Sequence, residues 1–151
     1  MEFLREVNDT IPEIFGDIIK TYDFKVERIT SSATLLYKDD YALYLASDRD
    51  YVDIWYVKKE ENKIMKYWLH PFLLENSTDE DRSNTKREDG LVTKLINYIL
   101  IYEKILRTKR KNILMGQMDW VEEYNQKTSM RSIRELYPNE YEKLKKVFCI
   151  E

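Results

Sequence analysis

The residue types that most often carry catalysis are scarce in this chain. His70 is its only histidine and Cys149 its only cysteine. A Ser/His/Asp or Cys/His arrangement would have to use His70, which precedes Pro71 at the expected end of a strand and lies far from Cys149 in the sequence. We interpret His70 as a structural or exposed turn histidine and Cys149 as a small packing residue. One cysteine and one histidine also exclude a zinc site of the Cys/His type.

Glycine-rich phosphate loops and carboxylate motifs for metals do not occur either. The 3 glycines lie far apart and form neither nucleotide-binding fingerprint. The run from Asp48 to Asp53 resembles the start of a calcium loop, but it lacks the turn glycine and the terminal glutamate. Asp53 and Lys58 do not have the spacing of a nuclease core. We therefore predict no catalytic residue, no metal and no cofactor, and a protein that is not an enzyme.

Aspartates are instead concentrated on two expected hairpin loops and the strand after them. Asp53 lies between Tyr51 and Trp55 on one face of the expected strand. Residues 52, 54 and 56 form the other face, which is apolar and should pack on helices. Either the two aromatics are exposed beside Asp53, or C-terminal helices cover their face too. Aspartate is also a common turn residue, so the loop carboxylates can be explained by turns alone. The candidate partner-binding residues are Asp39, Asp40, Asp48, Asp50, Tyr51, Asp53 and Trp55.

The middle of the chain has the period-two pattern of strands. The runs are separated by short polar segments, which suit hairpin loops, and short loops require antiparallel neighbours. β-branched and aromatic residues are frequent in these runs. We predict a meander of four or five strands over residues 24–29, 33–37, 41–46, 51–57 and 63–69, ending at His70-Pro71.

The two ends of the chain have the three- and four-residue spacing of helices. Thr10-Ile11-Pro12-Glu13 reads as a capping box, so the N-terminal helix over 3–22 should begin properly at Ile11 after a shorter helical turn. A largely buried helix is predicted over 89–108 and a third over 112–126. A fourth should follow Thr128-Ser129, with Ser132-Ile133-Arg134-Glu135 as its capping box. Pro138 interrupts it, and a last amphipathic stretch carries Tyr141, Leu144, Val147 and Phe148.

These elements predict one α+β domain over 1–151: an N-terminal helix, an antiparallel four- to five-stranded meander, and three to four C-terminal helices. The length of 151 residues fits one domain, and a hydrophobic content of 43% excludes a disordered chain. The window 91–106 is too short and too polar to cross a bilayer, and no signal peptide is visible. A single cysteine favours a cytoplasmic location.

Charge is distributed unevenly. Residues 1–60 carry an acidic excess and residues 87–151 a basic one, within a net charge of -3. The basic stretch (Lys104, Arg107, Lys109, Arg110 and Lys111) is the part most like a nucleic-acid site. Cations at a helix end also complement the helix dipole and need no ligand. Nucleic-acid binding is therefore a minor alternative.

The segment from Ile14 to Val26, a helix leading into Tyr22-Asp23-Phe24-Lys25-Val26, is followed by two strands that include Asp48-Arg49 and Val52-Asp53-Ile54. Together they resemble small bacterial immunity proteins of polymorphic toxin systems and related uncharacterised proteins. The resemblance covers about residues 11–57. Asp23 stands where glycine is usual in that pattern. The resemblance implies a non-enzymatic protein that binds and blocks a toxin domain.

An acidic surface with aromatic residues suits such an inhibitor, because opposite charge steers association and aromatic side chains anchor interfaces. We expect a cytoplasmic binding or inhibitory protein with a protein partner and no membrane association. The alternative is a self-associating structural module, such as a homodimer formed through exposed aromatics.

Overall fold

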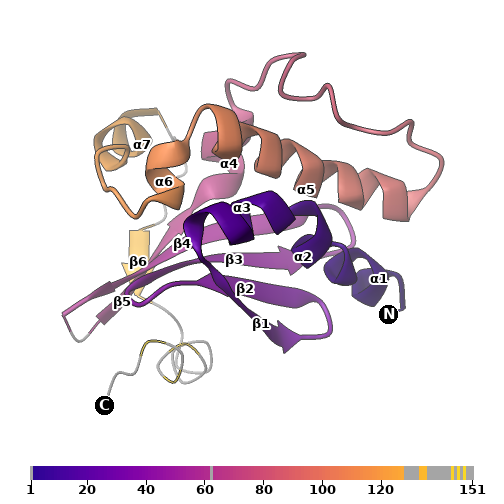
Figure 1. Cartoon of the computed structure of the whole chain (residues 1–151). Helices are drawn as coiled ribbons and strands as arrows, with labels where there is room; N and C mark the ends of the chain where they lie inside the picture. Colours follow the sequence, from indigo (N-terminus) through magenta and orange to yellow (C-terminus); the bar gives the residue numbers. More distant parts are fainter. Residues whose placement is uncertain are drawn as a thin grey trace.

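The computed structural model describes residues 2–61, 63–127 and 133–135, together with residues 144, 146 and 148. Its strands form one antiparallel sheet in which each strand pairs with the next along the chain (Figure 1). The strands are β1 (Lys25–Thr30), β2 (Ala33–Tyr37), β3 (Tyr41–Ser47), β4 (Val52–Glu60), β5 (Lys63–Trp68) and β6 (Ile133–Glu135). The predicted α+β class and five-stranded meander are confirmed.

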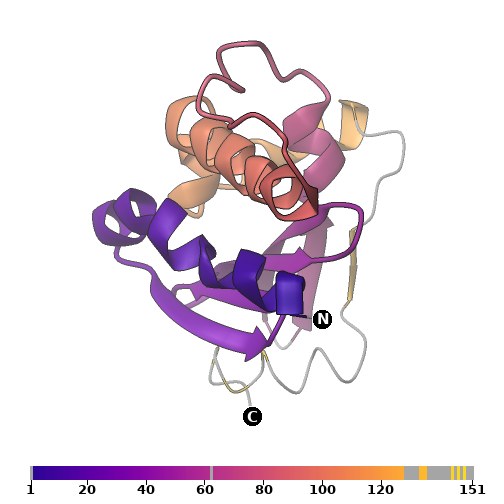
Figure 2. The ribbon, with the colours of Figure 1, turned by 90° about the vertical axis from the view of Figure 1, so that its right-hand side faces the viewer.

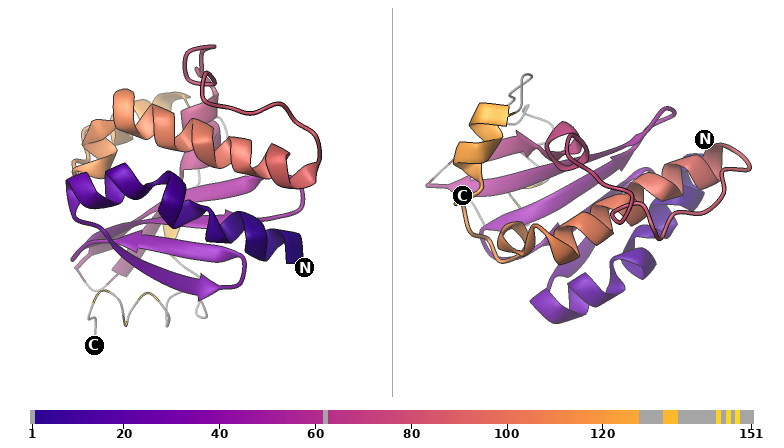
Figure 3. Two further views of the ribbon diagram at one scale, coloured as in Figure 1. Left: turned by 45° about the vertical axis from the view of Figure 1, so that its right-hand side comes forward. Right: turned by 90° about the horizontal axis from the view of Figure 1, so that it is seen from above.

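Helices cover one face of this sheet, as the end-on view shows (Figure 2). Seen from above, α5 and the run from α1 to α3 lie side by side over the strands (Figure 3). The helices are α1 (Glu2–Asp9), α2 (Ile11–Ile14), α3 (Gly16–Tyr22), α4 (Leu69–Leu74), α5 (Leu91–Thr108), α6 (Lys111–Leu114) and α7 (Val121–Lys127).

The N-terminal helical segment is interrupted at positions that were not predicted. It is divided into three short helices rather than one helix that begins at Ile11. Thr10 does not act as an N-cap, because its backbone is helical and its Oγ1 donates to the carbonyl of Val7 at 2.6 Å. The capping box predicted there is therefore wrong.

Three other elements differ from the prediction. The predicted helix over 112–126 is divided into α6 and α7, and Leu69–Leu74 forms a helix that the sequence pattern did not indicate. Ile133–Glu135 is a strand paired with β5, not the start of a fourth helix. Thr128, Ser129, Ser132, Pro138, Tyr141, Val147 and Cys149 lie outside the described residues.

The central strand β4 is buried on both of its faces. Val52, Ile54 and Tyr56 belong to the main core beneath the helices, as predicted. On the other face Trp55 and Val57 pack in a second cluster that includes Leu144 and Phe148 from the end of the chain. Trp55 is only 9% exposed, so the alternative in which the C-terminal part of the chain covers this face is correct for Trp55.

Tyr41 connects this sheet to the segment between α6 and α7. Its hydroxyl donates to the carbonyl of Leu114 at 2.8 Å. Gly116 lies against the same ring with a φ of 75°, and a Cβ placed on it would come within 2.5 Å of the ring. Glycine is required here both for its backbone conformation and for the close approach.

We expect Gly116→Ala to lower the free energy of unfolding by about 2–4 kcal/mol, because it adds left-handed strain and a clash with Tyr41. Denaturant unfolding measures the change. The matched control is Gly16→Ala, since Gly16 begins α3 and a Cβ added there would meet no atom within 4 Å. This control should be neutral or stabilising by up to about 1 kcal/mol. Equal effects of the two substitutions would contradict the role given to Gly116.

Candidate functional site

The sheet topology separates the seven predicted partner-binding residues. Asp39 and Asp40 lie in the β2–β3 loop, whereas Asp48 and Asp50 lie in the β3–β4 loop. Consecutive loops of a meander open at opposite ends of the sheet, and the 7 residues of β3 between them span about 20 Å. The structure therefore does not bring the five aspartates into one patch.

At the β2–β3 end, one of the two carboxylates is already paired. Asp40 accepts a 2.8 Å hydrogen bond from the ammonium of Lys58. The same ammonium lies 5.9 Å from the centre of the Tyr41 ring. Asp39 is exposed beside this pair. The negative charge available to a partner at this end is accordingly reduced.

The β3–β4 loop has a net negative charge, because Asp48 and Asp50 outnumber Arg49. Asp48 and Asp50 are exposed, and neither forms an ion pair with any cation in the part of the chain that the structure describes. Tyr51 follows them and packs against the ring of His70, with ring centres 4.6 Å apart. Tyr98 of α5 completes the group, 6.0 Å from His70 and 6.5 Å from Tyr51. We call Asp48, Asp50, Tyr51, His70 and Tyr98 the Tyr51 surface.

Asp53 lies beside this surface but has a structural role. Its carboxylate accepts hydrogen bonds from the indole of Trp68 at 2.6 Å and from the indole of Trp55 at 3.1 Å. Burial raises the pKa of Asp53, and these hydrogen bonds partly oppose the shift. The ammonium of Lys66 lies 4.1 Å from the centre of the Trp55 ring. Asp53 and Trp55 thus hold the sheet face together, and Trp55 is too buried to serve as the partner-binding residue that was predicted.

Two short hydrogen bonds of the Tyr102 hydroxyl fix the tautomer of neutral His70. The Tyr102 hydroxyl donates to the carbonyl of Val52 at 2.5 Å, and His70 Nδ1 lies 2.5 Å from the same hydroxyl. Because a hydroxyl has one proton to donate, we assign the proton of the neutral imidazole to Nδ1. Nε2 then carries a lone pair. Burial lowers the pKa of His70, which favours this neutral form.

The Tyr51 surface offers hydrogen-bond acceptors and aromatic faces. Burial raises the pKa of the Tyr51 phenol, and Asp53, Asp48 and Asp50 raise it further, so the phenol stays protonated at neutral pH. No serine, threonine or cysteine hydrogen-bonds to His70 among the described residues. Carboxylates around aromatic rings are suited to binding cationic groups.

The basic stretch is largely neutralised inside the protein. Lys104 pairs with Glu80, Arg107 with Glu103, Lys109 with Asp81 and Arg110 with Glu123. Two of these pairs hold the polar loop between α4 and α5 against α5, along which it runs in Figure 1. Burial alone would raise the pKa of Asp81, but hydrogen bonds from Lys109 and Thr78 hold it below its usual value. This pairing argues against a nucleic-acid site here.

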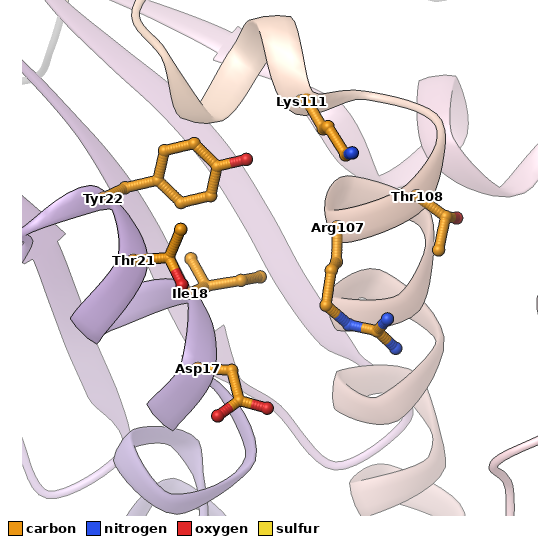
Figure 4. Close-up of a pocket in the computed structure, with 7 residues that line it drawn as sticks. All are labelled: Asp17, Ile18, Thr21, Tyr22, Arg107, Thr108 and Lys111. Carbon is orange, nitrogen blue, oxygen red and sulfur yellow. The ribbon is translucent and has the colours of Figure 1, made fainter.

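A pocket of about 450 Å³ lies between α3 and the C-terminal end of α5 (Figure 4). Sequence reasoning missed it, because its two walls are far apart in the chain and only folding brings them together. The lining residues are Asp17, Ile18, Thr21, Tyr22, Arg107, Thr108 and Lys111. Lys111 is the member of the basic stretch with no ion-pair partner among the described residues.

No family model matches the chain, and comparison with curated proteins and with solved structures finds no match either. Among the described residues, no helix is long and apolar enough to cross a membrane. Nor does any group of three or more His, Cys, Asp or Glu side chains converge as metal ligands would in the ranges that the structure describes.

Two tyrosines allow a matched test of the hydrogen bonds at His70. We expect Tyr102→Phe to lower the free energy of unfolding by about 2 kcal/mol, because it leaves the Val52 carbonyl and His70 Nδ1 without their partner. The control is Tyr56→Phe, whose hydroxyl is buried with no hydrogen-bond partner in the described structure. That control should be neutral or slightly stabilising. Equal losses would show that the hydrogen bonds of the Tyr102 hydroxyl add no stability of their own.

The single histidine also makes a defined pH dependence observable. The pKa of His70 is lower in the folded protein than its ordinary value of 6.5, so the unfolded chain binds more protons between the two values. The free energy of unfolding should therefore decrease as the pH falls below 6.5. His70→Asn, which keeps a donor near the Nδ1 position, should flatten this part of the profile. An imidazole pKa above 6.5 in an NMR titration would refute the assignment.

Proposed function

We propose that this chain is a non-enzymatic inhibitory protein, of the immunity-protein type, that binds a basic surface of a partner protein through its Tyr51 surface. The observation that carries the proposal is a pair of exposed carboxylates, Asp48 and Asp50, which have no ion-pair partner among the described residues and lie beside the packed rings of Tyr51 and His70. The resemblance of residues 11–57 to immunity proteins supports the same function.

The chemistry of this surface fits a cationic partner. Arginine or lysine side chains can pair with Asp48 and Asp50 and lie over the ring of Tyr51 or Tyr98. His70 Nε2 adds an acceptor, since Nδ1 donates to Tyr102. Tyr51, His70 and Tyr98 are all partly exposed, so they can contact a partner without a change in the core. Of the seven predicted residues, the proposed contact region keeps Asp48, Asp50 and Tyr51.

Self-association is the competing function. β1 is an edge strand, and most of its residues are exposed. Its edge carries Lys25, Glu27 and Arg28, which are typical of edges that avoid pairing with another chain. The exposed large apolar residues of the described structure, Val26, Leu91 and Met115, lie on three separate segments of the chain. These features favour a heterologous partner over a homodimer.

The first partner to test is the product of the neighbouring gene, because immunity proteins are encoded beside the toxins they block. Co-expression of this chain should restore growth to cells that produce the toxic domain. Asp48→Asn/Asp50→Asn should weaken the complex at least about tenfold, because it removes both negative charges of the Tyr51 surface. Binding should also weaken as ionic strength rises.

The matched control is Asp23→Asn/Asp39→Asn, which removes the same charge from exposed positions elsewhere. Asp23 has a φ of 58°, a conformation that asparagine accepts. The control should bind like the unmodified chain. A loss in the control alone would contradict the assignment to the Tyr51 surface. A homodimer by sedimentation, with no protection of growth, would support self-association instead.

A further inference from the structure

The pocket between α3 and α5 is separate from the Tyr51 surface, and its lining has an unusual distribution of charge. Asp17 stands on the α3 side, and Arg107 and Lys111 stand on the side of α5 and α6 (Figure 4). We propose that the pocket binds a small zwitterion, a molecule that carries an ammonium group and a phosphate or carboxylate group.

The cationic wall has donors that the protein does not use. Arg107 donates from Nε to Glu103 at 2.8 Å, and its two terminal nitrogens have no partner among the described residues. The ammonium of Lys111 and the hydroxyl of Tyr22 likewise have none within those residues, and both point toward the space between the walls (Figure 4). These donors can bind the oxygen atoms of one anionic group.

The opposite wall supplies a carboxylate. Asp17 is close enough to raise the pKa of Arg107, although Glu103 has the larger effect. Yet Asp17 and Arg107 do not form an ion pair within 4.0 Å. Two opposite charges therefore face each other across a gap that the protein leaves open. A ligand with its ammonium toward Asp17 and its anion toward Arg107 would satisfy both.

A simple anion fits this site less well. Asp17 and Glu103 balance the charges of Arg107 and Lys111, and the C-terminal end of α5 adds a partial negative charge. A zwitterion brings no net charge into these surroundings. The volume of about 450 Å³ lies in the range of small-molecule sites and exceeds what an amino acid needs. Ile18 and the ring of Tyr22 give the pocket an apolar part for a short carbon chain.

The test compares whole and half ligands by isothermal titration calorimetry on the full chain. Phosphoethanolamine and β-alanine are the zwitterionic probes, and inorganic phosphate and ethanolamine are the halves. We expect at least one zwitterion to bind about tenfold more tightly than either half at constant ionic strength. Chemical shifts of the Thr21 and Thr108 amides should change during the same titration.

Substitutions in each wall give different expected results. Lys111→Gln should weaken zwitterion binding about tenfold. Asp17→Asn should weaken the zwitterion but strengthen inorganic phosphate, because it removes a repelling charge. Arg87→Gln, in the exposed loop before α5, is the charge-matched control and should change neither. Asp17 and Lys111 are exposed, so these variants should fold normally.

Three results would overturn the proposal: no heat with any probe at millimolar concentrations, equal affinity for zwitterions and halves, or tighter zwitterion binding in the Asp17→Asn variant. The first would indicate that Arg107 and Lys111 serve only to offset Glu103 and the end of α5. The other two would indicate that Asp17 does not hold the ammonium group of a ligand. None of these results bears on the partner-binding proposal, since its variants and its assay are different.

Discussion

Burial of β4 on both faces is the constraint on which the rest of this structure depends. A strand covered on both sides must alternate its side chains correctly with respect to two cores, and a shift of one residue would exchange them. Val52, Ile54 and Tyr56 face the helices, whereas Trp55 and Val57 face the second cluster. Asp53 is the one charged residue within this alternation, and two indole N–H groups make its burial tolerable.

This fixed register determines where the polar loops lie. With β3 and β4 paired from Tyr41↔Lys58 to Ser47↔Val52, the β3–β4 loop must emerge beside α4 and the middle of α5. That position brings Tyr51 to His70 and Tyr98, although the three residues come from three separate elements. The candidate binding surface is thus a consequence of the register, not of a local motif.

The strands were predictable because their signals are local. Alternation and short polar loops placed the five meander strands within about three residues of their observed ends. Features that depend on distant contacts were not predictable. Ile133–Glu135 belongs to a sequence that suits a helix cap, yet it forms a strand by pairing with β5. Leu69–Leu74 forms a helix although it contains Pro71, because proline is tolerated in a first turn.

The candidate site shows the same limit. The sequence shows an acidic excess over residues 1–60. The prediction grouped the aspartates of the β2–β3 and β3–β4 loops into one surface, but in a meander these two loops lie at opposite ends of the sheet. The reasoning about strand faces left Trp55 undecided, since the residues that cover it, Leu144 and Phe148, are remote in sequence. The basic stretch was likewise read as one feature, although its ion-pair partners come from two other segments. Charges become binding sites only where the fold leaves them unpaired. By that criterion, among the described residues, Asp48 and Asp50 are available for binding on the Tyr51 surface, and Lys111 is available in the pocket between α3 and α5.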